Sequence, residues 1–268
     1  MSKPLRMILA TGDALRHRYA AATLAEEADV VGVVSEPKMP AASAAEPQEE
    51  RVVVLRHWAD RAEAERRWLG TAVSFPEIEL LSLSACGEIN SDGVVRWIEQ
   101  RRPDVVVLFG TSIIKPPLLH LYPGRLVNVH LGLSPYYRGS GTNFWPLVHR
   151  RPECVGATIH LAVARVDAGA ILAQLRPDAE LMDRAHDLGT KTIVAAFRAL
   201  PRVLMDYVEG RLDPRGQQLE AGRVFRRDDF NATAVGQMWR HFATGMMAEY
   251  VQDAERRRTA YPIVGLPN

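Results

Sequence analysis

Short apolar runs alternate with segments of helical periodicity through the first half of the chain. The apolar runs have the length and branched-residue content of buried β-strands, and they cover residues 6–11, 29–36, 78–84 and 103–110. The segments between them have helical spacing and cover residues 15–28, 49–70 and 91–102, the last with Ser91 as its N-cap. A strand–helix–strand order of this kind predicts parallel strands joined by right-handed crossovers.

The second half continues the pattern less regularly. Further strands are expected at residues 124–130, 156–163, 168–176 and 220–227. Helices are expected at 183–210, interrupted at Pro201, and at 231–257, and the segment 143–148 starts as a helix and stops at a Pro. Residues 37–47 predict a mobile surface loop. The fold class is therefore α/β, a doubly wound and mostly parallel Rossmann-like sheet, with a main domain at 1–210 and a small C-terminal extension at 211–268.

Composition narrows the classes of function. The chain has 268 residues, 47% hydrophobic and 24% charged, with a net charge of +1, which suits a globular protein and gives no long-range field toward nucleic acid or an anionic membrane. Its two cysteines form no disulfide framework or metal knuckle, and no signal peptide or membrane span is present. We therefore expect a cytoplasmic protein without a nucleic-acid or membrane partner.

The segment NVHLGLSPYYRG, residues 128–139, contains the first candidate for chemistry. Residues two apart on a strand face the same side, so Asn128 and His130 project together at the carboxyl edge of the sheet. An amide can donate to a developing oxyanion and an imidazole can pass a proton near neutral pH, which suits acyl transfer. The pair on its own fits a structural role at the strand end equally well. The first strand–helix turn lacks G-x-G-x-x-G, which excludes a nicotinamide enzyme.

Asp167 is the second candidate. It lies in the turn ARVDAG between two predicted strands, where an aspartate commonly bonds its own backbone. On the turn alone, the structural role is the favoured one.

Together these segments resemble the folate-dependent formyltransferase family, which includes methionyl-tRNA, phosphoribosylglycinamide and sugar N-formyltransferases. The resemblance rests on VNVHLGLSPYYRGSGTNFWPLV followed by GATIHLAVARVDAGAIL, in order and in spacing, across about residues 100–176. It implies that Asn128 holds the formyl oxygen, that His130 is a proton donor or second stabiliser, and that Asp167 orients His130 and relays the proton of the attacking amine.

The resemblance also implies 10-formyltetrahydrofolate as co-substrate, with no metal. Its pterin would lie between two loops whose residues are Phe109, Gly110, Thr111, Ser112, Ile113, Val163, Ala164, Arg165 and Val166. The remaining histidines lack metal-ligand spacing; among them His160 is expected to be a packed core residue with a smaller chance of a supporting role. Trp145 is likewise expected in the core.

The chain departs from the family pattern after His130. Gly132 and Ser134 stand where the family commonly has Ser and Leu. Ser134, Tyr137 and Arg138 are candidate contacts for the acceptor, although capping of the turn by Ser134 and fixing of the loop by Arg138 are the alternatives.

The expected function is N-formylation of a small amine, such as an amino sugar nucleotide, an amino acid derivative or a natural-product intermediate. Only 58 residues follow Gly210, too few for the C-terminal barrel of the tRNA enzyme. Two alternatives stay open: a 10-formyltetrahydrofolate hydrolase with water as acceptor, and a non-catalytic folate-fold binding protein. The C-terminal extension is a candidate homodimer interface.

Overall fold

The computed structural model describes residues 4–38 and 48–266, and its main sheet has the strand order β3-β2-β1-β4-β5-β7-β8. All neighbouring strands are parallel except β7, which runs antiparallel to both of its neighbours. The strands are β1 Arg6–Thr11, β2 Asp29–Ser35, β3 Leu80–Ser82, β4 Val105–Phe109, β5 Leu126–His130, β7 Ala157–Leu161 and β8 Ile171–Leu175. The predicted doubly wound, mostly parallel α/β fold is confirmed.

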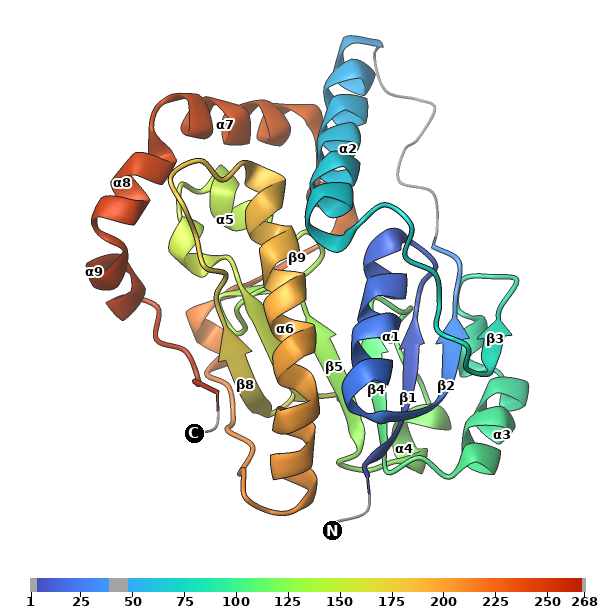
Figure 1. Cartoon of the computed structure of the whole chain (residues 1–268). Helices are drawn as coiled ribbons and strands as arrows, with labels where there is room; N and C mark the ends of the chain where they lie inside the picture. Colours follow the sequence, from blue (N-terminus) through green and yellow to red (C-terminus); the bar gives the residue numbers. More distant parts are fainter. Residues whose placement is uncertain (1–3, 39–47, 267–268) are drawn as a thin grey trace.

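Helices cover both faces of this sheet. Helices α1 and α6 lie on one face, α3 and α4 lie on the other, and α2 and α7 stand above the carboxyl ends of the parallel strands (Figure 1). The helices are α1 Leu15–Glu27, α2 Gln48–Leu69, α3 Asp92–Arg101, α4 Leu118–Leu121, α5 Trp145–Val148, α6 Ala185–Val208, α7 Ala232–Ala243, α8 Met246–Gln252 and α9 Ala254–Thr259. Ser91 caps α3 as predicted, because its side chain accepts the N–H of Val94.

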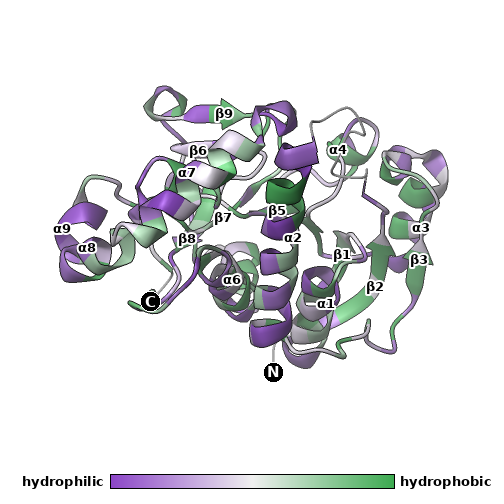
Figure 2. Ribbon diagram, turned by 90° about the horizontal axis from the view of Figure 1, so that it is seen from above, coloured by the Kyte–Doolittle hydropathy of each residue, from purple (hydrophilic) through white to green (hydrophobic). Residues whose placement is uncertain are grey.

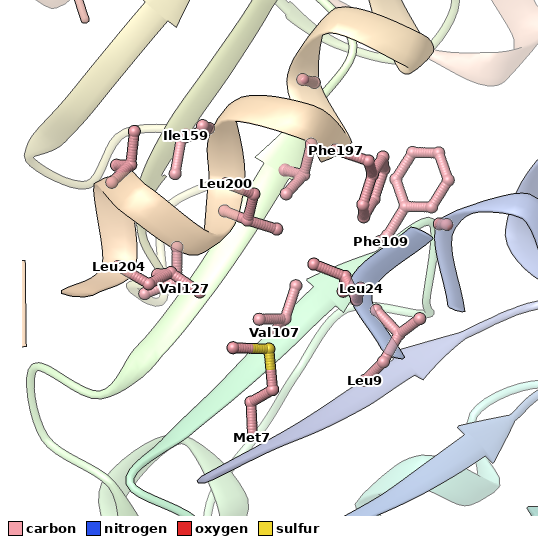
Figure 3. Close-up of a cluster of buried hydrophobic side chains, with 14 of the residues drawn as sticks. Met7, Leu9, Leu24, Val107, Phe109, Val127, Ile159, Phe197, Leu200 and Leu204 are labelled. Carbon is pink, nitrogen blue, oxygen red and sulfur yellow. The ribbon is translucent and has the colours of Figure 1, made fainter. Parts of the chain in front are cut away.

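The two faces of the sheet are filled by alternate residues of the same strands. In β1, Met7 and Leu9 belong to the core under α1 and α6, whereas Ile8 and Ala10 belong to the core under α3 and α4. Figure 3 shows Phe197 and the neighbouring side chains of α6 over the central strands. Burial of each such side chain stabilises the fold by about 1.5–3 kcal/mol, which explains why the central strands are apolar throughout.

Two proline predictions were wrong. Helix α6 runs through Pro201 without interruption, and α5 contains Pro146 in its first turn. A proline inside a helix costs about 3 kcal/mol, but Leu200 and Leu204 beside Pro201 are fully buried, and their burial offsets that cost. In α5 the proline occupies a position where no backbone N–H bond is lost.

The single helix predicted at 231–257 was also wrong, because the structure has α7, α8 and α9 in its place. Gly245 adopts a left-handed φ of 81°, which ends α7 and turns the chain. The turn lets Met246 and Tyr250 of α8 pack with Met238 of α7 in a separate hydrophobic cluster. Tertiary packing therefore divides a segment of continuous helical propensity.

The C-terminal extension pairs with the main body through a small parallel sheet. In it, β6 Tyr137–Gly139 pairs with β9 Arg223–Phe225. Seen from above, this pair and α7 lie at one side of the molecule, and α3 and β3 lie at the other (Figure 2). The boundary at residue 210 stays a prediction, and residues 39–47 of the expected mobile loop lie outside the described residues. Within the described residues, no helix is both long and apolar enough to cross a membrane.

Candidate active site

Asn128, His130 and Asp167 meet at the carboxyl edge of the sheet. The Asn128 amide nitrogen lies 3.3 Å from Oδ1 of Asp167, and Nδ1 of His130 lies 3.3 Å from Oδ2 of the same carboxylate. Asn128 and His130 lie two residues apart on β5, so the strand alternation directs both toward one point. Asp167 comes from the loop between β7 and β8 with a φ of +46°.

The Asp167 loop is fixed by several contacts. The N–H of Gly139 in β6 donates to Oδ2 of Asp167 at 2.8 Å. The Gln217 amide donates to the backbone carbonyls of Asp167, at 3.0 Å, and Gly169, at 2.6 Å. A Cβ at Gly169 would stand 1.7 Å from the carbonyl oxygen of Leu161, so only glycine fits there. The β6 strand and the C-terminal extension thereby help to hold the carboxylate.

Burial and charge set the protonation of the pair. Burial raises the pKa of Asp167, but the charge of His130, the contacts with His160 and the Gly139 N–H outweigh it and hold this pKa well below its usual range. Burial lowers the pKa of His130, and the Asp167 carboxylate only partly opposes this. At neutral pH the site therefore has an ionised Asp167 beside a neutral His130.

His130 contacts acceptors on both sides of its ring. Its Nε2 lies 3.0 Å from the Tyr137 carbonyl, which can only accept, so Nε2 carries the hydrogen. In the neutral ring Nδ1 then has no hydrogen, although it faces the Asp167 carboxylate. A proton taken up at Nδ1 would satisfy both contacts, which suits His130 to the role of a base.

His160 contacts the other residues of the site, although it was predicted mainly as a packed core residue. It is buried as expected, yet its Nε2 lies 3.1 Å from the Asn128 amide nitrogen and 3.5 Å from Oδ1 of Asp167. Its Nδ1 lies 2.9 Å from the Leu161 carbonyl, which can only accept, and the Asn128 amide nitrogen can only donate, so the hydrogen of that contact points to Nε2 of His160. The antiparallel register, with Asn128 opposite His160, creates this contact, and strand pairing cannot be deduced from one strand alone.

A cavity of 1420 Å³ opens beside these residues and is lined by Asn128, His130, His160 and Asp167. Most of the residues predicted to bind the co-substrate also line it: Phe109, Gly110, Thr111, Ser112, Ile113, Val163, Ala164 and Val166. Arg165 is exposed and is not among the lining residues. The two loops expected to enclose a pterin therefore do face one cavity.

Glu36 organises the first of these loops and was not identified from the sequence. Its buried carboxylate accepts the N–H of Ser112 at 2.9 Å, of Gly87 at 2.7 Å and of Ile89 at 3.2 Å. These bonds tie the loop after β4 to the segment after β3. Glu36 follows β2, so it reaches both loops from the same edge of the sheet.

The three candidate acceptor contacts lie behind the cavity wall. Ser134, Tyr137 and Arg138 are all buried, and none of them lines the cavity. The Tyr137 hydroxyl bonds Nδ1 of His149 at 3.0 Å, and Arg138 donates to the Leu219 carbonyl at 3.3 Å. The contacts of Tyr137 and Arg138 suit the fixing of the loop, and direct contact of the three side chains with an acceptor stays a prediction.

The absence of a side chain at Gly132 has a steric explanation. A Cβ at this position would stand 2.6 Å from Nε2 of His130 and 2.6 Å from Cβ of Thr142. The glycine therefore makes room for the His130 ring in the orientation that reaches Tyr137 and Asp167.

Comparison with known proteins identifies the family of this chain. The sequence profile of the formyl transferase family matches residues 3–204, which include Asn128, His130, His160 and Asp167. The chain belongs to the formyl transferase family and is an enzyme that transfers formyl groups.

Solved structures share the fold at low sequence identity. A sugar N-formyltransferase from Shewanella sp. has a TM-score of 0.55 at 20% identity, over 84% of this chain and 78% of that one. The phosphoribosylglycinamide formyltransferase from Anaplasma phagocytophilum has 0.55 at 16% identity, over 83% and 100%. The sugar 3N-formyltransferase WlaRD, crystallised with dTDP and 5-N-formyl-THF, has 0.54 at 17%, over 86% and 72%. At these identities the likeness establishes the fold.

Proposed function

We propose that this enzyme transfers the formyl group of 10-formyltetrahydrofolate to the amine of a small molecule. The observation that carries the proposal is the convergence of Asn128 and His130 on the Asp167 carboxylate, at the wall of a cavity that both predicted pterin loops line. A related enzyme crystallised with 5-N-formyl-THF supports the choice of donor. The cavity is large enough for this, since ligand sites of about 300–1,000 Å³ hold drug-sized molecules.

Asn128 stabilises the oxyanion in the proposed reaction. Its amide nitrogen donates to His160 at 3.1 Å and, over a longer distance, to Asp167 at 3.3 Å. The hydrogen of the longer contact is the easier one to redirect to a formyl oxygen as that oxygen gains charge. His160 holds the rest of the amide in place.

His130 accepts the proton of the attacking amine. The amine nitrogen bonds to the formyl carbon, the bond from that carbon to the folate nitrogen breaks, and the amine proton moves through His130 to the leaving nitrogen. Uptake at Nδ1 gives an imidazolium between the Asp167 carboxylate and the Tyr137 carbonyl. Asp167 stabilises that cation, so the pair acts as a proton relay.

Three of our other predictions belong with this proposal. The acceptor is a small amine, and the C-terminal extension is a candidate homodimer interface. Sugar N-formyltransferases among the similar structures are consistent with the first. A cytoplasmic location, expected from the absence of a disulfide framework, also stays a prediction.

An absorbance assay combined with mass spectrometry tests the proposed function. Tetrahydrofolate release from 10-formyltetrahydrofolate is followed by absorbance with and without a panel of amines, and formylated products are identified by mass spectrometry. We expect release that depends on an amine, with one formylated amine formed for each tetrahydrofolate. Release of formate at a rate independent of every amine would assign the hydrolase activity instead. If neither tetrahydrofolate nor formate is released, the alternative of a non-catalytic binding protein is favoured.

A further inference from the structure

Polar atoms without partners gather on a second part of the cavity wall, contributed by α2, α6 and the loop before α5. The atoms are Nδ1 of His57, Nε1 of Trp58, Nδ2 of Asn143 and Nε2 of His186; all are buried and without a hydrogen-bond partner among the described residues. All four residues line the cavity. A buried polar group without a partner costs about 1–3 kcal/mol, and four on one wall indicate a surface shaped for a polar ligand.

Aromatic rings enclose this part of the wall. His57 lies at the centre of the group, with ring centroids 4.5 Å from His186, 5.2 Å from Phe144 and 5.1 Å from Phe230. Burial first, then His186 and then Arg61, lower the pKa of His57 to about 3. Burial and Arg61 lower the pKa of His186 to about 4. Both imidazoles are therefore neutral at pH 7 and offer hydrogen bonds without charge.

Cations border the same region. Arg16 donates to the Glu65 carboxylate at 2.9 Å, and Nε of Arg61 donates to the same oxygen at 3.0 Å. Lys38 is a third cation, and its Nζ would lie 3.0 Å from a Cβ at Gly110. Burial and then repulsion from Arg16 and Arg61 lower the pKa of Lys38 to about 8. In this part of the cavity wall, the Glu65 carboxylate thus faces three cations, Arg16, Lys38 and Arg61.

The remaining charged residues of the cavity wall do not cancel this excess of positive charge. Glu36 is occupied by three backbone N–H groups and Asp167 by the catalytic pair. Asp228 also lines the cavity, but Arg226 and Arg227 line it beside this carboxylate. The cavity therefore favours a ligand that carries negative charge.

We propose that His57, Trp58, Asn143 and His186, with Arg16, Lys38 and Arg61, form the acceptor subsite, and that the acceptor is an amine ending in a compact oxyanion, a carboxylate or a phosphate monoester. The inference rests on the proposed function and names the class of its acceptor. Helix α2 encloses this end, where His57 is 2% exposed and Glu65 5% exposed. An enclosed end suits the terminus of a ligand. The guanidinium of Arg61, with four N–H donors besides the one on Glu65, suits oxyanion recognition.

Ligand-observed NMR with three matched amines tests the proposal: 4-aminobutyrate, 3-aminopropyl phosphate and butylamine. We expect the native enzyme to bind one or both of the anionic amines at millimolar concentration and butylamine at least about tenfold more weakly. The stronger of the two anionic probes assigns the carboxylate or the phosphate. Equal binding of all three, or binding of none at millimolar concentration, would overturn the proposal.

Charge-removing variants locate the binding. We expect Arg61→Gln and Lys38→Gln each to weaken the anionic amine at least about fivefold and to leave butylamine unchanged. Arg56→Gln is the matched control, because it removes the same charge from an exposed position on α2 outside the cavity. Equal losses in the control and in the two variants would overturn the assignment. Lys38 forms no bond to Glu65, so Lys38→Gln separates ligand contact from any disturbance of the Arg–Glu pairs.

Titration of 5-formyltetrahydrofolate into the same variants separates this inference from the proposed function. We expect its affinity to be retained in Arg61→Gln, which lies outside both pterin loops. Folate binding without any preference for anionic amines would contradict the acceptor subsite alone. Loss of folate binding in the native enzyme would contradict the proposed function.

Discussion

The Oδ2 atom of Asp167 lies 3.3 Å from Nδ1 of His130 and accepts the N–H of Gly139 at 2.8 Å. One carboxylate oxygen thus joins β5, which carries His130, to β6, which pairs with the C-terminal extension. The proposed proton relay through His130 depends on the charge of Asp167.

Asp167→Asn should lower turnover by at least about two orders of magnitude, because the imidazolium formed at His130 loses its counter-charge. The control is Asp178→Asn, whose side chain is exposed. Steady-state kinetics of the two variants checks the prediction. Turnover in Asp167→Asn within a few fold of the native enzyme would remove Asp167 from the relay.

The same variant should show a pH-dependent loss of stability. The pKa of Asp167 is depressed in the folded state, so its stabilising contribution is fully present above the unfolded value of about 4 and is lost as the pH falls through the folded pKa. We expect Asp167→Asn to be less stable by about 1.5–3 kcal/mol at pH 7. Urea unfolding should show this difference shrinking below pH 4, and a constant difference would contradict the depressed pKa.

Turnover at a pH just below about 6.5, the usual pKa of histidine, should equal turnover at neutral pH. Burial lowers the pKa of His130, so the ring remains a base below pH 6.5 and is protonated only in more acidic solution. The acid limb of kcat against pH should therefore lie below about 6.5. An acid limb above this value would show that the carboxylate dominates over burial.

Glu36→Gln should weaken the co-substrate more than it slows the chemical step. The variant replaces a carboxylate that accepts three backbone N–H groups, and it loosens the loop after β4. We expect KM for the folate to rise about tenfold with kcat changed little. Glu27→Gln, at an exposed position on α1, is the control, and an equal KM in both variants would contradict the role of Glu36.

Gly169→Ala should destabilise the fold or displace the Asp167 loop, because its Cβ would meet the Leu161 carbonyl oxygen at 1.7 Å. We expect a loss above about 3 kcal/mol together with loss of activity. Gly216→Ala has no atom within 4 Å of its Cβ and should be neutral. Thermal unfolding of both variants tests the difference.

The sequence predicted the elements whose pattern is local. The period of two along β5 placed Asn128 and His130 on one side, and the apolar run of β4 located the loop that lines the cavity. The roles of His160 and Glu36 were not predicted, because they depend on contacts with neighbouring strands and loops. No single segment of the sequence encodes those contacts. Helix α2 was predicted as a helix, yet its packing against α6 and α7 brings His57 to the cavity, and that packing has no local signal.

Asn128→Ala separates binding from chemistry at the proposed oxyanion donor. Loss of one such donor typically lowers turnover by about 10²–10³. The loops proposed to hold the co-substrate lie on other parts of the cavity wall, so its affinity should be nearly retained. Turnover measured beside folate affinity checks both halves, and a parallel loss of affinity would indicate that Asn128 binds the ground state equally well.

Calorimetric titration of 5-formyltetrahydrofolate, a donor analogue that should not transfer its formyl group, tests the central claim most directly. The native enzyme should bind it at micromolar strength, about −8 kcal/mol, and Asn128→Ala should bind it almost as tightly. No detectable heat at millimolar ligand would contradict a folate donor, and the Asn128, His130 and Asp167 side chains would then need another source of the formyl group.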